Sequence, residues 1–308
     1  FLREMEFNRL LSQAISFYGE ANSEKSINKK EIKLNKINVN KYETILDEKK
    51  LDKWIAILKD KKIISVDTET NSINPIDADL VGISFCYSPN HACYIPIKHS
   101  TQKCLDKQLV LDKVKKILED RSIKKIGQNI KFDNIILKKN NINVDPLEDT
   151  MLVSYTLDAG INRHNLDTLA SIHLDHKTIT FKDLVGTGKK KITFEDVDLK
   201  KATEYAAEDA DVTFRLYEVL KERLDKEKLN KIYELFEIPL VKILSEMEIN
   251  GIKVDDIYLK KLSKKFENKI DSIEKEIYAL ANKKFNIAST KQLGEIIYNE
   301  LKIRNLKK

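Results

Sequence analysis

Cysteine and long apolar runs are scarce in this chain, and each scarcity excludes a class of protein. The three cysteines, Cys86, Cys93 and Cys104, have neither the spacing of a zinc site nor an even count. We therefore expect free thiols in a reducing compartment rather than a disulfide framework. No stretch is long and apolar enough to cross a bilayer, so the sequence predicts a protein without a membrane partner.

Length and charge leave broad possibilities open. The 308 residues suffice for about two domains, and 42% of them are hydrophobic, enough for real cores. The net charge of +6 is compatible with nucleic-acid binding, although lysine-rich solvated helix faces would produce the same balance. Because the chain begins at Phe1 rather than at a methionine, we expect an excised fragment of a longer protein.

The first forty residues do not have the pattern of a domain. Residues 1–19 place apolar side chains at helical spacing, but one helix cannot form a core by itself, so we expect the end of an upstream region. Residues 20–39 are rich in Asn, Ser, Lys and Glu with little periodicity, which predicts a flexible linker.

A globular pattern begins at Lys41. Alternating strand and helix signals follow, including a helix capped by Asp47 and a hairpin that turns at Pro89 and Asn90. The predicted strands are IISVDTE, LVGISFCYS, HACYIPI and IKKIG, and the predicted helices begin near residues 48, 106 and 129. This order predicts an α/β fold with a mixed sheet flanked by helices.

A helical segment completes the chain. The composition turns strongly charged around Arg223–Lys231, and residues 257–280 then place apolar side chains three or four positions apart. That spacing predicts one long amphipathic helix, with Asp255 and Asp256 in its first turn. Such a helix needs a partner for its apolar face.

Four carboxylates and a tyrosine in three separated stretches carry the chemical signal. They are Asp67 and Glu69 in IISVDTET, Asp133 in GQNIKFDN, and Tyr205 and Asp209 in YAAEDADV. Carboxylates that a fold gathers repel one another, so they usually surround cations. Hard divalent ions such as Mg²⁺ take oxygen ligands and keep positions open for water and phosphate oxygens. The set therefore indicates metal-assisted cleavage of a phosphodiester.

The spacing within each stretch places side chains together. Asp67 and Glu69 are two apart on a strand, so they share a face. Tyr205 and Asp209 are four apart on a helix, so they also share one. A D-x-E pair recurs by chance in a chain with 49 acids, and Tyr205 could be an ordinary core residue. The three stretches together, in this order, favour a site over these simpler interpretations.

Two further stretches admit a simpler interpretation. Asn129 and Asp133 are four apart on a helix, yet Asn129 could only cap that helix while Asp133 is solvated. The run Gly186–Lys191 lacks the spacing and the hydroxyl of a nucleotide-binding phosphate loop, which excludes a nucleotide-hydrolase site. Its lysines either face a DNA backbone or form an exposed basic turn.

The three stretches resemble the proofreading 3′–5′ exonuclease domain of bacterial family A DNA polymerases. VDTETNSI is similar to the first exonuclease motif of that family, GQNIKFD to the second and YAAEDAD to the third, whose tyrosine defines one branch of the DEDD exonucleases. The resemblance extends through LVGISF, NRHNLDTLA and HKTITF. It implies a ribonuclease H-like sheet flanked by helices over residues 41–222.

Flanking segments resemble other parts of the same polymerases. LREMEFNRLL is similar to the last helix of the 5′ nuclease region, which assigns residues 1–40 to a remnant of that region and a linker. EIPLVKILSEMEINGIKVD and FNIASTKQL resemble the opening helices of the polymerase region, so we expect residues 223–308 to form a truncated part of the thumb. The polymerase aspartates are expected beyond Lys308, so the resemblance implies that the parent protein, rather than this chain, extends primers.

The resemblance also implies hydrolysis with two divalent ions, Mg²⁺ or alternatively Mn²⁺ or Zn²⁺. At the matching positions, Asp67, Glu69 and Asp209 would hold one ion, while Asp67 and Asp133 would place the second. Ions about 3.5–4 Å apart can stabilise both the attacking and the leaving oxygen. Tyr205 and Glu69 would orient the attacking water, because a hydroxyl with a pKa of about 10 is a poor base at neutral pH.

The implied substrate is the single-stranded or frayed 3′ end of DNA. Ile73 would wedge against the terminal bases and Phe181 would stack on them. Gln128, Asn129 and Arg163 match positions near the substrate end. The product is a nucleoside 5′-monophosphate, and the readier fraying of mismatched ends makes the activity a proofreading one. The family further implies a monomer in the bacterial cytoplasm that works at the nucleoid.

Two other functions stay open at this point. Some relatives keep this domain as a scaffold without catalysis. An exoribonuclease of the same superfamily would use the same metal site, because that site does not itself reject a 2′-hydroxyl. The four carboxylate positions and the tyrosine position are all filled in this chain, which favours an active enzyme, and the polymerase-like segments favour DNA.

Overall fold

The computed structural model describes residues 5, 7, 9–13, 36–188 and 191–303. The chain forms two compact units, Phe1–Asn250 and Gly251–Lys308. Residues 9–13 are helical, whereas most of the expected first helix, and the expected linker as far as residue 35, lie outside the described residues. The domain boundaries drawn from the sequence stay predictions.

Six strands of the first unit form one sheet in the order β1-β4-β3-β2-β5-β6. The central strand β2 pairs antiparallel with β3 and parallel with β5, so the sheet is mixed, as the sequence predicts. Its strands are β1 (Glu43–Thr44), β2 (Ile63–Thr70), β3 (Leu80–Ser88), β4 (His91–Pro96), β5 (Lys124–Gly127) and β6 (Leu147–Asp149).

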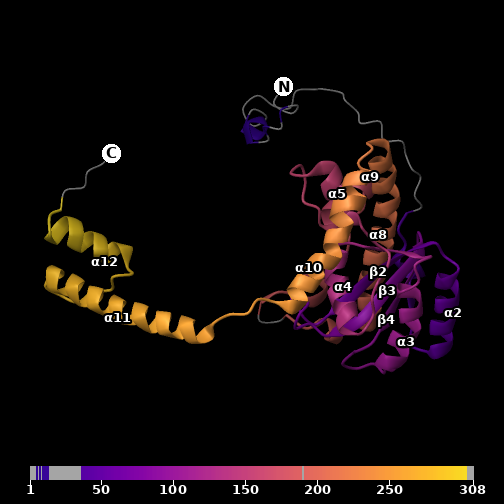
Figure 1. Cartoon of the computed structure of the whole chain (residues 1–308), viewed down its shortest axis with the longest axis horizontal. Coiled ribbons are helices and arrows are strands. Elements are labelled where there is room, and N and C mark those ends of the chain that lie inside the picture. Colours follow the sequence, from indigo (N-terminus) through magenta and orange to yellow (C-terminus); the bar gives the residue numbers. More distant parts are fainter. Residues whose placement is uncertain (1–4, 6, 8, 14–35, 189–190, 304–308) are drawn as a thin grey trace. The chain divides into compact units, whose positions relative to one another are not determined.

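Helices surround the sheet (Figure 1). Asp47 begins the first of them by accepting the N–H of Lys50, as predicted. The helices are α2 (Glu48–Lys59), α3 (Lys107–Leu118), α4 (Ile130–Lys139), α5 (Thr150–Asp158), α6 (Leu166–Leu174), α7 (Phe181–Val185), α8 (Leu199–Lys226), α9 (Asn230–Ile232) and α10 (Ile238–Asn250). Short 3₁₀ turns are η1 (Val39–Lys41) and η3 (Phe194–Asp196), and the π-helical turn η4 (Tyr233–Glu237) joins α9 to α10.

The central strands supply a core to each face of the sheet. On one face, apolar side chains of β2, β3 and β4 pack with α2, α3 and α4; this core includes Ile64, Val66, Ile83, Phe85, Leu51, Trp54, Val114 and Ile136. Figure 1 shows α2 and α3 side by side. On the other face, Cys86, Ala92 and Ile126 pack against α8. The unit is therefore a three-layer α/β/α sandwich, and the three cysteines are free, as expected.

Strand β3 needs a glycine opposite the acidic end of β2. Gly82 pairs with Glu69 across the two strands. A Cβ atom at Gly82 would lie 2.3 Å from ring atoms of Tyr94, whose side chain is buried on β4. Only a residue without a Cβ fits there while the ring keeps its place.

We expect Gly82→Ala to lower the free energy of unfolding by about 1–3 kcal/mol, because the buried ring must move to admit the methyl group. Urea denaturation would measure the loss. In a Tyr94→Leu background the same substitution should cost clearly less, since the ring is gone. An equal loss in both backgrounds would contradict the steric explanation.

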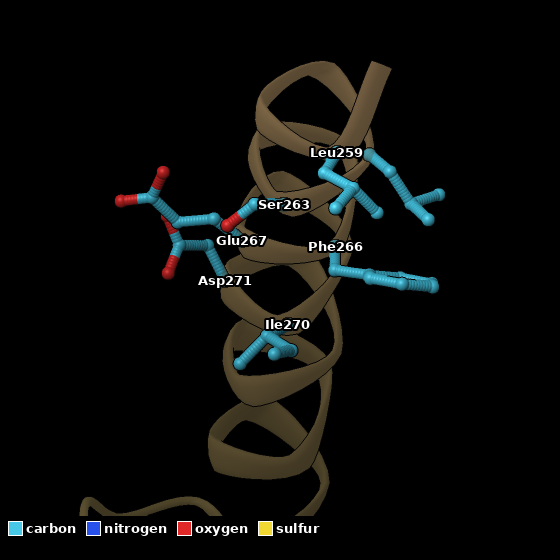
Figure 2. A pocket seen from close by; sticks show the side chains of 7 residues that line it. Leu259, Ser263, Phe266, Glu267, Ile270 and Asp271 are labelled. Carbon is cyan, nitrogen blue, oxygen red and sulfur yellow. The ribbon is translucent and has the colours of Figure 1, made fainter. Parts of the chain in front are cut away.

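The second unit contains α11 (Asp256–Ala281), α12 (Thr290–Gly294) and the π-helical turn η5 (Glu295–Glu300). Asp255 caps α11 with its side chain, and the long helix predicted over 257–280 is confirmed. Figure 2 shows Leu259 and Phe266 on one side of this helix and Glu267 and Asp271 on the other. These residues border a hollow of about 450 Å³, so α11 is amphipathic in the predicted sense.

Candidate active site

The alternation of strand β2 sends two acids toward helix α8. Val66 faces the core beneath α2, α3 and α4. Ser65 faces the other way, where its Oγ donates to the carbonyl of Ala210 on α8 at 2.6 Å. Because side chains two apart on a strand share a face, Asp67 and Glu69 point the same way as Ser65.

Helix α8 brings a third carboxylate to this face. Its Ala206 and Ala210 are fully buried, and their small side chains allow the helix to lie close to the sheet. Asp209 thereby meets Asp67 and Glu69, and one carboxylate oxygen from each lies within 4.8 Å of the other two. The fold thus gathers three of the four acids that the sequence singled out.

Burial and repulsion raise the pKa values of these three acids well above their ordinary range. For Glu69 the largest cause is burial, followed by the charges of Asp67 and Asp209. Burial is also the largest cause for the pKa values of the other two. The buried Oε1 of Glu69 has no hydrogen-bond partner among the described residues. A buried oxygen without a partner is costly, so this donor set fits a hard divalent cation.

Asp133 approaches β2 from the opposite face of the sheet. It is buried on α4, and its Oδ1 accepts bonds from the backbone N–H and the hydroxyl of Thr68 at 2.8 and 2.6 Å. Thr68 lies between Asp67 and Glu69, so its side chain points away from theirs. Burial, followed by the negative charge of Asp67, raises the pKa of Asp133, so Asp133 interacts electrostatically with the acid cluster. Asp133 is not among the three oxygens within 4.8 Å, and its role as a metal ligand stays a prediction.

Tyr205 lies one turn before Asp209 on α8, so the two side chains share a face of the helix. Burial, followed by the negative charges of Asp209 and Glu69, raises the pKa of Tyr205 above its ordinary value. The hydroxyl is therefore a neutral donor, which suits the expected positioning role and not that of a base. Its ring lies beside Phe181, with the ring centroids 6.0 Å apart.

A cleft of about 710 Å³ opens over the three acids. Its lining includes Ile73, which is 94% exposed, and Phe181, which is 38% exposed. Solvent-facing apolar side chains beside a cluster of carboxylates suit a ligand with both flat bases and anionic phosphates. The two apolar substrate contacts expected from the sequence therefore line the same cleft as the acids.

The loop that carries Ile73 is tied to helix α4. Lys139, the last residue of that helix, donates from Nζ to the carbonyls of Pro75, Ile76 and Ala78 at 3.0, 2.6 and 2.8 Å. These bonds restrain the loop between β2 and β3 even though the tip side chain is in solvent. The cleft wall is thus fixed to the helix that supplies the fourth acid.

The other three expected substrate contacts do not line this cleft in the part of the chain that the structure describes. Gln128 donates from Nε2 to the carbonyl of His164 at 2.7 Å, so its amide is engaged within the protein. Asn129 stands at the N-cap of α4 with φ 60° and without a capping side-chain bond. Arg163 lines a separate hollow of about 670 Å³. Their contact with substrate stays a prediction.

Further side chains of the cleft were not singled out in the sequence as substrate contacts; among them are Phe132, Ile192 and Phe194. Lys191 also lines the cleft. The position of Phe132 directly before an expected metal ligand was an available signal. Lys191 ends the basic run discussed above, and its Nζ lies 6.0 Å from the ring centroid of Phe181.

Comparison with known families now adds an identity to this geometry. Residues 42–225 match the family described as 3′–5′ exonuclease, and residues 256–308 match DNA polymerase family A. The chain therefore belongs to the 3′–5′ exonuclease family of the family A DNA polymerases, which confirms the resemblance. Among the residues that the structure describes, no helix has the length and apolar character needed to pass through a membrane.

Relatives of known name agree with this assignment. The chain is 41% identical over 259 residues to DNA polymerase I of Rhizobium leguminosarum, an alignment that covers 78% of this chain and 26% of the relative. It is 39% identical over 254 residues to DNA polymerase I of Pseudomonas aeruginosa, which covers 80% and 28%. The chain thus spans about a quarter of the length of the curated relatives it matches.

Solved structures share the fold. The POL domain of Pol1 from M. smegmatis, in complex with DNA primer-template and dNTP, superposes with a TM-score of 0.66 at 20% identity and covers 86% of this chain and 42% of its own. Brucella melitensis NrnC with bound Mg²⁺ superposes with a TM-score of 0.52 at 25% identity and covers 68% and 93%. The expected ribonuclease H-like architecture, a mixed sheet flanked by helices, is confirmed.

Substitution of one acid should stabilise the metal-free protein. The folded state raises the pKa values of the three acids. At low pH the acids are protonated and do not repel one another; as pH rises through the raised pKa values they ionise, and the free energy of unfolding falls. In the presence of a chelator at pH 8, we expect Asp209→Asn to raise Tm by about 2–4 °C, which corresponds to about 1 kcal/mol in a domain of this size. At pH 5 the rise in Tm should be smaller. Differential scanning calorimetry would measure both.

The same measurement with Mg²⁺ supplies the control. Mg²⁺ should raise Tm of the unsubstituted protein and of Asp112→Asn, whose carboxylate is exposed on α3, but should raise Tm of Asp209→Asn much less. A lower Tm for Asp209→Asn in chelator at pH 8 would show that the acids do not repel one another in the folded state.

Proposed function

We propose that this chain is a proofreading exonuclease that hydrolyses the terminal phosphodiester of single-stranded or frayed DNA 3′ ends and releases nucleoside 5′-monophosphates. The observation that carries the proposal is the meeting of Asp67, Glu69 and Asp209 within 4.8 Å in an open cleft. Solvent-facing Ile73 and Phe181 in the same cleft support nucleobases as the neighbouring ligand. The family and its DNA polymerase I relatives support DNA as the polymer.

Divalent ions would complete the acid cluster. Asp67, Glu69 and Asp209 would hold one Mg²⁺, Mn²⁺ or Zn²⁺ ion, while Asp67 and Asp133 would place a second. When bound, such ions activate a water molecule and offset the charge of the attacked phosphate. The partnerless oxygen of Glu69 supports this assignment, as does the likeness to NrnC with bound Mg²⁺.

Side chains of the chain itself would position the reactants. Tyr205 is a neutral hydroxyl at the wall of the cleft, so it would hold the attacking water by hydrogen bonding together with Glu69. Ile73 and Phe181 would separate and stack the terminal bases, and Phe132 adds a further aromatic ring to that wall. A mismatched end frays more readily and therefore enters the cleft more often.

The polymerase context extends the proposal to the parent protein. The match of residues 256–308 to DNA polymerase family A supports a parent that is a DNA-directed DNA polymerase. The likeness to a structure in complex with DNA primer-template supports DNA as the partner. We further propose that the chain acts as a monomer in the bacterial cytoplasm, at the nucleoid, and that the polymerase site belongs to parts of the parent outside it.

Removal of Asp67 tests the reaction. We expect the full chain with Mg²⁺ to release single nucleotides from a single-stranded DNA oligonucleotide, and Asp67→Ala to lower kcat on the order of 10²–10³-fold, because it removes a carboxylate shared by both proposed ions. Product analysis of a 3′-labelled oligonucleotide, with and without chelator, would measure this.

Two comparisons make that test decisive. Asp112→Ala on α3 removes an exposed acid outside the cleft and should keep full activity. No nucleotide release from the unsubstituted chain would favour a silent scaffold, and faster digestion of a matched RNA strand would favour an exoribonuclease.

Removal of Phe181 tests the substrate site. We expect Phe181→Ala to raise KM for single-stranded DNA about 5- to 100-fold, since stacking on one aromatic ring contributes roughly 1–3 kcal/mol per base. The Mg²⁺-dependent rise in Tm should persist, because the acids are untouched. Phe236→Ala is a matched control, as this phenylalanine is 62% exposed and does not line the cleft. Similar KM values for the two variants would contradict the stacking role.

A further inference from the structure

Glu208 directly precedes Asp209 on α8 and is 2% exposed, yet it is not part of the acid cluster. Its Oε1 lies 2.9 Å from Nε2 of His176, and its Oε2 accepts the backbone N–H of Ile179 at 2.7 Å. Each oxygen therefore has a protein partner, which distinguishes Glu208 from Glu69. A buried carboxylate with these contacts is an anchor and not a free cation ligand.

The segment that Glu208 contacts leads directly into the cleft. Residues 175–180 have no helix or strand of their own, so bonds to neighbouring elements fix their path; one is the backbone bond from the N–H of His176 to the carbonyl of Ala170 at 3.3 Å. Ile179 is two residues before Phe181, which begins α7 and lines the cleft. A further bond restrains the same segment, because Thr178 donates from Oγ1 to Asp167 at 2.6 Å.

Helix α8 thus connects the two halves of the site. One of its residues, Asp209, contributes to the acid cluster, and the preceding residue, Glu208, holds the segment that presents an aromatic ring. Because both lie on one continuous helix, the separation between the acids and that ring is set by the helix and not by the flexibility of the segment.

We propose that Glu208 is a positioning residue: it anchors residues 176–179 to α8 and so holds Phe181 where a 3′-terminal nucleotide can stack while its phosphate lies at the acids. This inference rests on the proposed exonuclease function. Without the anchor, the segment would have to become ordered when DNA binds, and that cost would weaken binding of the strand. The anchor thereby pre-organises the substrate site.

Substitutions on both sides of the anchor separate positioning from simple charge. Glu208→Ala removes both bonds but also a negative charge beside Asp209. His176→Ala breaks one bond from the other side and leaves that charge in place. Glu208→Gln keeps an oxygen for the N–H of Ile179 and an amide donor for the ring nitrogen of His176. Asp175→Asn is the control, since Asn tolerates the left-handed backbone of this position, φ 51°.

Hydrogen–deuterium exchange of the full chain tests the anchor without reference to activity. We expect exchange of residues 176–185 to accelerate about tenfold in Glu208→Ala and to increase in His176→Ala, and to stay near the unsubstituted rate in Glu208→Gln and Asp175→Asn. Unchanged exchange in both alanine variants would overturn the proposal. A similar rise in Tm with Mg²⁺ in every variant would show that the acid cluster is intact.

Kinetics with a single-stranded DNA oligonucleotide and Mg²⁺ test the consequence. KM should rise about tenfold in Glu208→Ala with little change in kcat, and Glu208→Gln should restore it. In a Phe181→Ala background, Glu208→Ala should add little, because the ring that it positions is absent. Additive losses, or a loss in Glu208→Gln equal to that in Glu208→Ala, would overturn positioning in favour of a charge effect on Asp209.

The two proposals fail in different ways. If the unsubstituted chain releases no nucleotides, the exonuclease proposal and the role of the anchor in substrate binding both fall, although faster exchange would still establish the anchor itself. If the unsubstituted chain digests DNA and the anchor variants match its KM, only the positioning role is overturned.

Discussion

Mutual repulsion among three closely spaced carboxylates, of which Glu69 is buried, is the constraint around which the exonuclease unit is built. Asp67 and Glu69 stay together because their part of β2 pairs with β3, opposite Ser84 and Gly82, while the start of the strand pairs with β5 as far as Ser65. Asp209 stays close because small buried side chains and the bond from Ser65 to Ala210 hold α8 on the sheet. The packing of both faces of the sheet therefore offsets the unfavourable free energy of repulsion among the acids. A divalent ion would relieve that repulsion, so the rigidity of the scaffold and the affinity for metal are two aspects of one property.

The two-residue period of β2 decides which helix each side chain meets. Asp67 and Glu69 face α8, while Thr68 between them faces α4 and binds Asp133 through two donors. A shift of one residue in the strand register would exchange these faces. The acid cluster therefore depends on the pairing of Glu69 with Gly82 and of Asp67 with Ser84 on β3. The fourth acid differs from the other three because it reaches the strand end from the opposite layer.

Local patterns in the sequence were sufficient for the elements that carry the site, but not for the neighbours of its acids. The apolar run in IISVDTE predicted β2, and the four-residue spacing placed Tyr205 and Asp209 on one face of α8. Helical spacing places Glu208 and Asp211 on faces of α8 other than that of Tyr205 and Asp209, and the structure buries both. Asp211 accepts bonds from Tyr42, 169 positions away, and from Arg215 on the same helix. The arginine four residues later was a usable signal. Contacts across such long separations leave no trace in local periodicity, so their effect on burial could not be inferred.

Helix α10 contributes to the support of the fourth acid, although it follows the charged run that begins at Arg223. Within the first unit, Arg223 itself pairs with Asp158 and Glu227. The chain then continues through α10, which packs beside α4 (Figure 1). There Asn134 donates to Ser245 of α10 at 3.1 Å, one position after Asp133. The helix that precedes the polymerase-like residues is therefore part of the support of the fourth acid, and a displacement of α10 would act directly on the helix that carries it.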